Sequence, residues 1–438
     1  MQNHMDYKTD VLIIGTGVAG LYCALNLRED FQILMITKES MRDSNTYLAQ
    51  GGISTALNKE DIPCFIKDTL KAGGYKNNIS SVQILCTESR ENINTLLDWG
   101  LPLDKKQGGL AYTREGAHSI NRIVHCSDST GKTLEECLIK KVQSHKNITI
   151  FENTEFVDIL VEDNCCIGGI VIKEGKPFII IAKVVVLACG GIGGLFKNTT
   201  NQSTVTGDGI AIAIKNNIKL KDLSYIQFHP TALYEENINS RRFLISESLR
   251  GEGAKLYNSK GQRFVKELLP RNVVAKAIYK EIRTSGIPYV MLDFSFQPED
   301  YIKQRFPLIY EECKKRGLDI TKEAIPVSPA QHYFMGGIEV DLFSRTSMNN
   351  LYAVGETACT GVHGNNRLAS NSLLEGIVFS KRAASDINTQ VDLIKASCLK
   401  DFPDILHNLK EIQKNMKSLV IKELLRRSKE FHAEFFNH

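Results

Sequence analysis

Residues 10–38 read DVLIIGTGVAGLYCALNLREDFQILMITK, and this stretch decides the fold. The β-branched run at residues 10–14 predicts a strand, and residues 32–36 predict a second one. Between them, the apolar periodicity of residues 18–27 predicts a helix that packs on one face. This is the opening of a βαβ unit, so we expect an α/β, Rossmann-like fold built on a parallel sheet.

The turn between the first strand and the helix is GTGVAG, with glycines at Gly15, Gly17 and Gly20. Glycines here permit a tight turn and let the backbone and the free helix N-terminal amides approach a pyrophosphate. A purely structural glycine turn is the alternative. The acidic residue that would hold an NAD ribose is missing, because Thr37 and Lys38 stand at the end of the second strand. The motif therefore predicts a dinucleotide site and weakens an NAD interpretation.

A second glycine cluster, VVLACGGIGG at residues 185–194, follows another apolar run. It is expected where a chain passes a second time beside a long dinucleotide, although a strand-ending turn would look similar. Residues 148–187 alternate in short strands and predict a small antiparallel meander. Helices are predicted at residues 272–283, 307–316 and 405–435, and another is predicted to start at Ser372.

The composition excludes several classes of function. A net charge of +4 over 438 residues gives no dense basic stripe, so nucleic acid is not expected as a partner. The apolar stretch at residues 184–196 is too short and too glycine-rich to span a membrane, and no secretory signal is recognisable, so we expect a cytoplasmic protein. The 11 cysteines have no metal-ligand spacing, which predicts reduced thiols and no metal site.

Seven further segments are informative when they are taken together and in chain order. They are NTYLAQGG (45–52), TREGAHS (113–119), QFHPTAL (227–233), SESLRGEGAKL (246–256), HYFMGGIEVD (332–341), NLYAVGE (350–356) and HGNNRLASNSLLEG (363–376). They resemble the succinate dehydrogenase and fumarate reductase flavoprotein family, to which aspartate oxidases also belong. The resemblance implies an FAD-binding domain at residues 1–222 and 334–403, an inserted α+β capping domain at residues 223–333, and a short C-terminal helical region at residues 404–438.

The resemblance also implies which residues contact FAD. Where family members bind FAD covalently, a histidine lies at the position of Asn45, so non-covalent FAD is expected here. The implied cofactor residues are Gly15, Gly17, Val18, Ala19, Gly20, Lys38, Asn45, Thr46, Ala49, Gln50, Gly51, Gly52, Asp208, Glu356, Ser372 and Leu373.

The substrate site that the resemblance implies is rich in cations. Arg367 suits a carboxylate because its guanidinium fork matches carboxylate geometry. Arg271 resembles the family's proton-transfer arginine, and Arg271, His229, Glu247 and Arg250 form the predicted catalytic set. The predicted substrate-binding residues are Glu115, His229, Ser246, His332 and Arg367.

Within the family, the pair Ala369-Ser370 and the sequence at residues 113–115 favour aspartate oxidation, whereas Met335 is common in the succinate group. The favoured interpretation is oxidation of L-aspartate to iminoaspartate, the first step of NAD biosynthesis. Oxygen or fumarate would accept the electrons, and a transient coupling to quinolinate synthase is implied. The alternatives are a soluble fumarate reductase or succinate dehydrogenase, and a flavin-binding module without catalysis.

Overall fold

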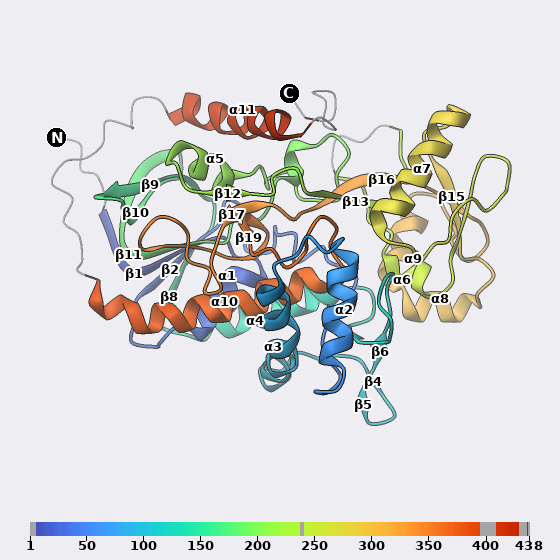
Figure 1. The fold of residues 1–438 in the computed structure, drawn as a ribbon, viewed down its shortest axis with the longest axis horizontal. Coiled ribbons are helices and arrows are strands. Elements are labelled where there is room, and N and C mark those ends of the chain that lie inside the picture. Colours follow the sequence, from blue (N-terminus) through green and yellow to red (C-terminus); the bar gives the residue numbers. More distant parts are fainter. Residues whose placement is uncertain (1–5, 237–240, 395–408, 429–435, 437–438) are drawn as a thin grey trace.

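A computed structural model describes residues 6–236, 241–394, 409–428 and 436. Its main sheet has seven strands (Figure 1). The central strands β2, β1, β11 and β18 are parallel, with Val11 beside both Ile33 and Val184. The strands of this sheet are β1 (Asp6–Ile14), β2 (Ile33–Ile36), β8 (Ile148–Phe151), β9 (Thr154–Glu162), β10 (Cys165–Lys173), β11 (Lys176–Leu187) and β18 (Leu351–Ala353).

The predicted meander is only partly right. Strands β9, β10 and β11 are antiparallel neighbours, but β8 pairs in parallel with β2 at the far edge of the sheet. Strand β11 also pairs in parallel with β1, so the meander continues the main sheet instead of forming a separate one. The alternating pattern of these strands shows burial on each face, but not which neighbour a strand pairs with.

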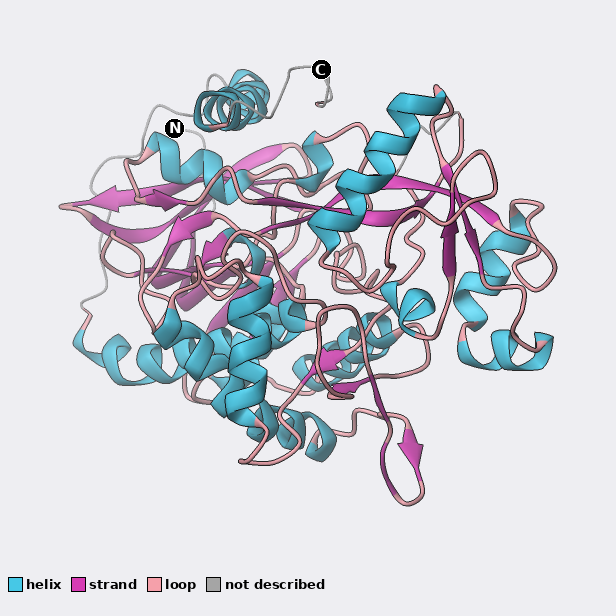
Figure 2. Cartoon of the chain, turned by 45° about the vertical axis from the view of Figure 1, so that its right-hand side comes forward, coloured by secondary structure: helices cyan, strands magenta, loops and turns pink. Residues whose placement is uncertain are grey.

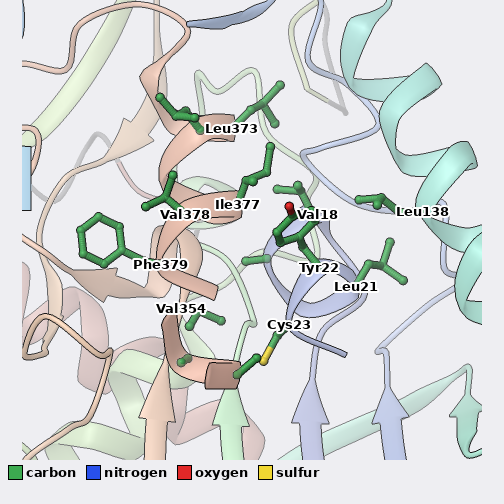
Figure 3. Packing of buried hydrophobic residues seen from close by; sticks show 14 of the residues in the cluster. Val18, Leu21, Tyr22, Cys23, Leu138, Val354, Leu373, Ile377, Val378 and Phe379 are labelled. Atoms are coloured by element: carbon green, nitrogen blue, oxygen red, sulfur yellow. The ribbon is translucent and has the colours of Figure 1, made fainter. Parts of the chain in front are cut away.

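Helices cover both faces of this sheet, and alternate strand residues pack into two different cores. Val11 and Ile13 belong to the core under helices α1 and α10, whereas Leu12 and Ile14 belong to the core under α5 and α11. Such burial on both faces is typical of parallel strands. Figure 2 shows the same layers from a second side, and Figure 3 shows α1 packed against α10. The helices on these two sides are α1 (Val18–Asn26), α2 (Ile62–Ala72), α3 (Ile79–Asp98), α4 (Thr130–Gln143), α5 (Asp208–Lys215), α10 (Asn371–Gln390) and α11 (Leu409–Arg427), of which α3 packs on α10 and α2 on α3.

The region beside the main sheet is a second, smaller α+β layer. It has a four-stranded sheet in the order β13-β16-β15-β14 and its own hydrophobic core between Leu233 and Val327. The predicted helices at residues 272–283 and 307–316 are confirmed as α7 and α9. The elements are β13 (Ile226–Leu233), α6 (Glu247–Gly251), β14 (Lys255–Tyr257), α7 (Arg271–Ser285), β15 (Val290–Asp293), α8 (Glu299–Arg305), α9 (Pro307–Lys315) and β16 (Ile325–Phe334).

Because this core is separate, we propose the division at residues 1–222, 223–333 and 334–403 for the folded chain; the proposed boundary between 403 and 404 lies outside the described residues. Helix α10 begins at Asn371, which agrees with the predicted start at Ser372. Of the predicted helix at residues 405–435, residues 409–427 are helical, and residues 405–408 and 429–435 lie outside the described part. The mixed architecture confirms the predicted α/β class.

The remaining elements are short. They are β3 (Ile53–Ser54), β4 (Lys105–Lys106), β5 (Gly109–Leu110), β6 (Tyr112–Thr113), β7 (Ile123–Val124), β12 (Leu220–Lys221), β17 (Gly337–Glu339) and β19 (Ala358–Cys359), with 3₁₀ turns at Gly193–Leu195, Gly355–Thr357 and Val391–Leu393. Among the described residues, no helix is long and apolar enough to cross a membrane.

Candidate active site

The glycine turn lies where the carboxyl ends of β1 and β11 meet. Gly15 has φ +112°, and a Cβ atom there would lie 2.3 Å from the carbonyl oxygen of Ala188, just past β11. Gly20 is equally tight, because its Cβ would lie 2.1 Å from the carbonyl oxygen of Gly15. Gly17 caps α1 without a side-chain hydrogen bond, which leaves helix amides to bind an anion.

One long cavity runs from this turn into the capping region. The space between its walls is about 1710 Å³, which includes space open to solvent. All the predicted cofactor, substrate and catalytic residues line it except Gly20 and Arg250. Gly20 instead packs against the turn, and Arg250 lies behind Glu247. The sequence motifs therefore meet in one place.

Lys38 and Asp208 form an ion pair at one end of the cavity. The Nζ–Oδ2 distance is 2.6 Å, and Lys38 also donates to the carbonyl oxygen of Thr204 and to Thr206 Oγ1. Burial lowers the pKa of Lys38, but Asp208 more than offsets this, so the net shift is upward and the lysine stays cationic. Where NAD sites have an acidic residue at the end of the second strand, this chain has Lys38, which is paired with Asp208.

The loop at residues 45–52 forms the middle of the cavity wall. Asn45 donates to Asn201 Oδ1 at 2.5 Å and accepts from the backbone of Gln202. Thr46 Oγ1 accepts from the first amide of α1. At Gly52, a Cβ atom would lie 2.2 Å from the carbonyl oxygen of Val124, so only glycine fits there.

Two buried polar side chains, Gln50 and Glu356, line the same cavity. Gln50 Oε1 is buried without a hydrogen-bond partner among the described residues. Glu356 Oε1 accepts from the backbone of Phe334, and burial raises the pKa of this carboxyl to about 7. A buried acceptor without a donor costs about 1–3 kcal/mol, which a bound ligand can recover.

Arg271 opens helix α7 and is held by two side chains. Its Nε lies 2.5 Å from Glu247 Oε2, and its Nη1 donates to Gln227 Oε1 at 3.0 Å. Arg250 approaches the other oxygen of Glu247 at 3.5 Å. Burial raises the pKa of Glu247, but Arg271 and Arg250 outweigh it, so the pKa is lowered and the carboxylate stays charged. The predicted catalytic arginine, carboxylate and second arginine therefore form a connected buried chain.

Among the described residues, Arg367 pairs with a hydroxyl and not with a carboxylate, and its Nε is buried without a hydrogen bond. Its Nη1 donates to Ser372 Oγ at 2.7 Å. Burial, together with Arg271, lowers the pKa of Arg367 to about 10, which still leaves it cationic at neutral pH. An unneutralised buried cation is a site for an anionic group.

His229 and His332 lie edge to face, with ring centroids 5.0 Å apart. His229 Nδ1 accepts from the backbone of Thr231, so the proton lies on Nε2, which has no partner in the described part of the chain. His332 Nδ1 pairs with Thr200 Oγ1 at 2.8 Å. Burial, and then Arg271, lower the pKa of both histidines well below the usual value, so both are neutral.

Glu115 is a buried carboxyl between the two parts of the structure. It accepts from Ser248 Oγ at 3.1 Å and from Ser370 Oγ at 2.6 Å. Burial and the nearby charge of Glu247 raise its pKa. Ser246, the remaining predicted substrate residue, caps α6 by accepting from the backbone of Ser248.

Several residues in or beside the cavity were not predicted, and three of them carry polar side chains relevant to the proposed substrate site. Gln227 accepts from Arg271 and donates to the carbonyl oxygen of Arg367, so it links the two arginines. Tyr333 lies under the Arg367 guanidinium, and Arg241 lines the cavity. Gln227 and Tyr333 lie inside quoted motifs, two positions and one position from the predicted histidines, and that proximity is the signal that could have found them.

Comparison with known proteins explains this arrangement. Residues 10–373 match a family described as an FAD binding domain. L-aspartate oxidase from Clostridium acetobutylicum is 58% identical over 392 residues, which cover 89% of this chain and 90% of that protein. L-aspartate oxidase from Clostridium perfringens is 57% identical, covering 89% of this chain and 88% of that protein. The chain belongs to the L-aspartate oxidase family of FAD-binding flavoproteins.

Solved structures agree with this family membership. A variant of the FrdA chain of E. coli quinol fumarate reductase has a TM-score of 0.84 at 29% identity and covers 94% of this chain and 74% of that chain. Sdh1 of Mycobacterium smegmatis has a TM-score of 0.77 at 29% identity, covering 97% and 80%. The predicted family resemblance is therefore confirmed.

The family match confirms FAD as the predicted cofactor, and the cavity fits it. The α1 amides and the glycines at Gly15 and Gly17 suit its pyrophosphate, and the Lys38–Asp208 pair suits a polar group beyond it. Gln50 Oε1 offers an unused acceptor on the cavity wall. Among the described residues, no cluster of metal-ligating side chains occurs.

Proposed function

We propose that this member of the L-aspartate oxidase family oxidises L-aspartate to iminoaspartate. One observation carries the proposal: a buried acid, Glu115, lines the same cavity as the cations Arg271 and Arg367. A dicarboxylate that also bears an ammonium group needs this combination of charges. Bound FAD supplies the acceptor for the two electrons and the hydrogen that leave the substrate's Cα as a hydride.

One cation, Arg367, and two neutral donors would hold the carboxylates. Arg367 is buried, cationic and free of a carboxylate partner among the described residues, so a substrate carboxylate can take its fork. His229 Nε2 and the hydroxyl of Ser246 are further donors on the cavity wall. These contacts would fix the position of the substrate.

Glu115 would bind the ammonium. Its direct partners are the hydroxyls of Ser248 and Ser370, and burial together with the charge of Glu247 raises its pKa, so the substrate ammonium would supply a cation in direct contact. Succinate has no such group. Glu115 therefore distinguishes an amino acid from the plain dicarboxylate.

Arg271 would manage the proton. As the hydride leaves Cα, one proton leaves the ammonium, and the product is an imine in its protonated form. Arg271 faces the cavity, and Glu247 and Arg250 continue from it into the protein. We assign Arg271 as the proton-transfer group: it would pass the proton on its Nε to the Glu247 carboxylate as it takes one from the substrate, with Arg250 beyond Glu247 in the relay.

The second candidate is a soluble fumarate reductase or succinate dehydrogenase, which the structural similarity to FrdA favours. Anaerobic addition of L-aspartate or succinate to the FAD-loaded protein separates the two. Loss of the visible flavin absorbance with L-aspartate alone supports the proposal, whereas loss with succinate alone contradicts it.

The acceptor, the flavin linkage and the partner remain parts of the proposal. Fumarate is a suitable acceptor because it carries the same two carboxylates as the substrate; oxygen is the other. Asn45 has no nucleophilic ring nitrogen, so denaturation should release FAD into solution. We also propose transient coupling to quinolinate synthase in the cytoplasm, tested by whether that enzyme raises the yield from the unstable imine.

A further inference from the structure

Directly behind Arg367 lies a buried polar cluster that takes no part in the chemistry proposed above. Tyr333 places its ring under the guanidinium, with Arg367 Cζ 4.5 Å from the ring centroid. On its other side, the Tyr333 hydroxyl donates to Glu375 Oε2 at 2.8 Å. Arg367, Tyr333 and Glu375 thus form a row that leads from the cavity into helix α10.

Glu375 is an anion held entirely inside the protein. Its side chain accepts from Thr360 Oγ1 at 2.5 Å and pairs with His363 Nε2 at 2.8 Å. Burial raises its pKa, but His363 and the hydrogen bonds outweigh burial, so the net shift is downward. The residue is 1% exposed, so this charge acts on its neighbours with little screening by water.

We infer that Glu375 and Tyr333 are positioning residues that hold Arg367 cationic and aimed at a substrate carboxylate without neutralising it. This inference rests on the proposed function. A carboxylate in direct contact with Arg367 would occupy the fork that the substrate needs. A phenol between them instead passes on part of the negative charge, because a ring whose hydroxyl donates to a carboxylate is richer in electrons and attracts a cation over its face more strongly.

The surroundings of Arg367 make such support necessary. Arg271 repels it, and burial disfavours its charge. Tyr333, Glu356 and Glu115 act in the opposite direction, and the last two are needed for other contacts in the cavity. Tyr333 is the only one of these groups that contacts the guanidinium face among the described residues.

The test uses the FAD-loaded protein and malonate as the probe. Malonate has two carboxylates on one carbon, so it cannot be dehydrogenated and reports binding alone. Titration calorimetry gives its Kd, and steady-state rates give KM and kcat for L-aspartate. Tyr333→Phe removes the hydroxyl but keeps the ring. We expect its malonate Kd and its KM to rise about three- to tenfold, with kcat changed less than about twofold.

Tyr352→Phe is the matched control. Tyr352 is also buried, and its hydroxyl donates at 2.7 Å to Asp386, another carboxylate on α10, away from the cavity. This variant should keep the wild-type Kd and KM. Glu375→Gln should resemble Tyr333→Phe, and the double variant should add less than about twofold to the larger single effect, because one change removes the hydroxyl and the other the charge of the same contact.

Arg367→Leu separates this inference from the proposed function. If it abolishes malonate binding while Tyr333→Phe behaves like Tyr352→Phe, the inference is wrong and the carboxylate site stands. A loss of kcat in Tyr333→Phe with unchanged Kd and KM also overturns the inference. Normal malonate binding by Arg367→Leu would overturn both.

Discussion

The two ends of the cavity are formed by different chemical groups, backbone at one end and charged side chains at the other. At the cofactor end, the backbone of Gly15, Gly17 and Gly52 allows close approach of a ligand, and helix α1 begins at this turn. At the substrate end, charged side chains from separate elements meet, as Arg271 of α7 meets Glu247 of α6. We therefore expect the cofactor end to be sensitive mainly to changes of shape and the substrate end mainly to changes of charge.

The sharpest test of this contrast is Arg271→Leu at the substrate end. Removing the proposed proton-transfer group should lower turnover of L-aspartate by about 10²–10⁴-fold. FAD content should stay at the wild-type level, because Arg271 lies at the end of the cavity away from the glycine turn. Turnover and the ratio of flavin to protein absorbance check this. Wild-type turnover would remove Arg271 from the mechanism.

Gly15→Ala should give the opposite result. The new Cβ would lie 2.3 Å from the carbonyl oxygen of Ala188 at a φ of +112°, so the turn has to shift and FAD binding should weaken by about 100-fold or more. Gly175→Ala is the control, since Gly175 also has positive φ but has nothing within 4 Å. Fluorescence titration of the apoprotein with FAD gives both constants. Equal FAD affinity in the two variants would contradict the close-approach argument.

Glu115→Gln should affect one substrate and spare a related ligand. The ion pair with the ammonium is lost, so kcat/KM for L-aspartate should fall by about 10–100-fold while the Kd of malonate changes little. Loss of malonate binding to the same extent would show that Glu115 has a structural role only.

The pH dependence follows from the raised pKa of Glu115. Below that pKa the carboxyl is neutral and cannot pair with an ammonium, so KM for L-aspartate should rise as pH falls. His229 and His332 do not contribute to this change, because their pKa values are lowered and both rings are already neutral. A KM profile of Glu115→Gln that keeps the wild-type slope would assign this titration to another group.

The same contrast explains what the sequence could predict. The glycine turn was recognisable because β1, the turn and α1 are consecutive, and the cap helices α7 and α9 show local periodicity. Gln227 and Tyr333 could not be given roles, since their partners Arg367 and Glu375 lie 140 and 42 positions away along the chain. Strand β8 was misplaced for a related reason: pairing with β2 depends on contacts across more than 100 residues.

The smallest effect on FAD binding is expected from a change at Lys38. It is a charged residue at the otherwise backbone-built cofactor end, and it pairs with Asp208 at 2.6 Å. Lys38→Met should weaken FAD binding by roughly tenfold, since Asp208 is left without its cation. Lys215→Met is the matched control, because Lys215 also pairs with an aspartate, Asp158, but lies at the other end of α5 and does not line the cavity. If Lys38→Met binds FAD as tightly as Lys215→Met, the charge of Lys38 takes no part in FAD recognition. The lysine at the end of β2 then only keeps Asp208 in place.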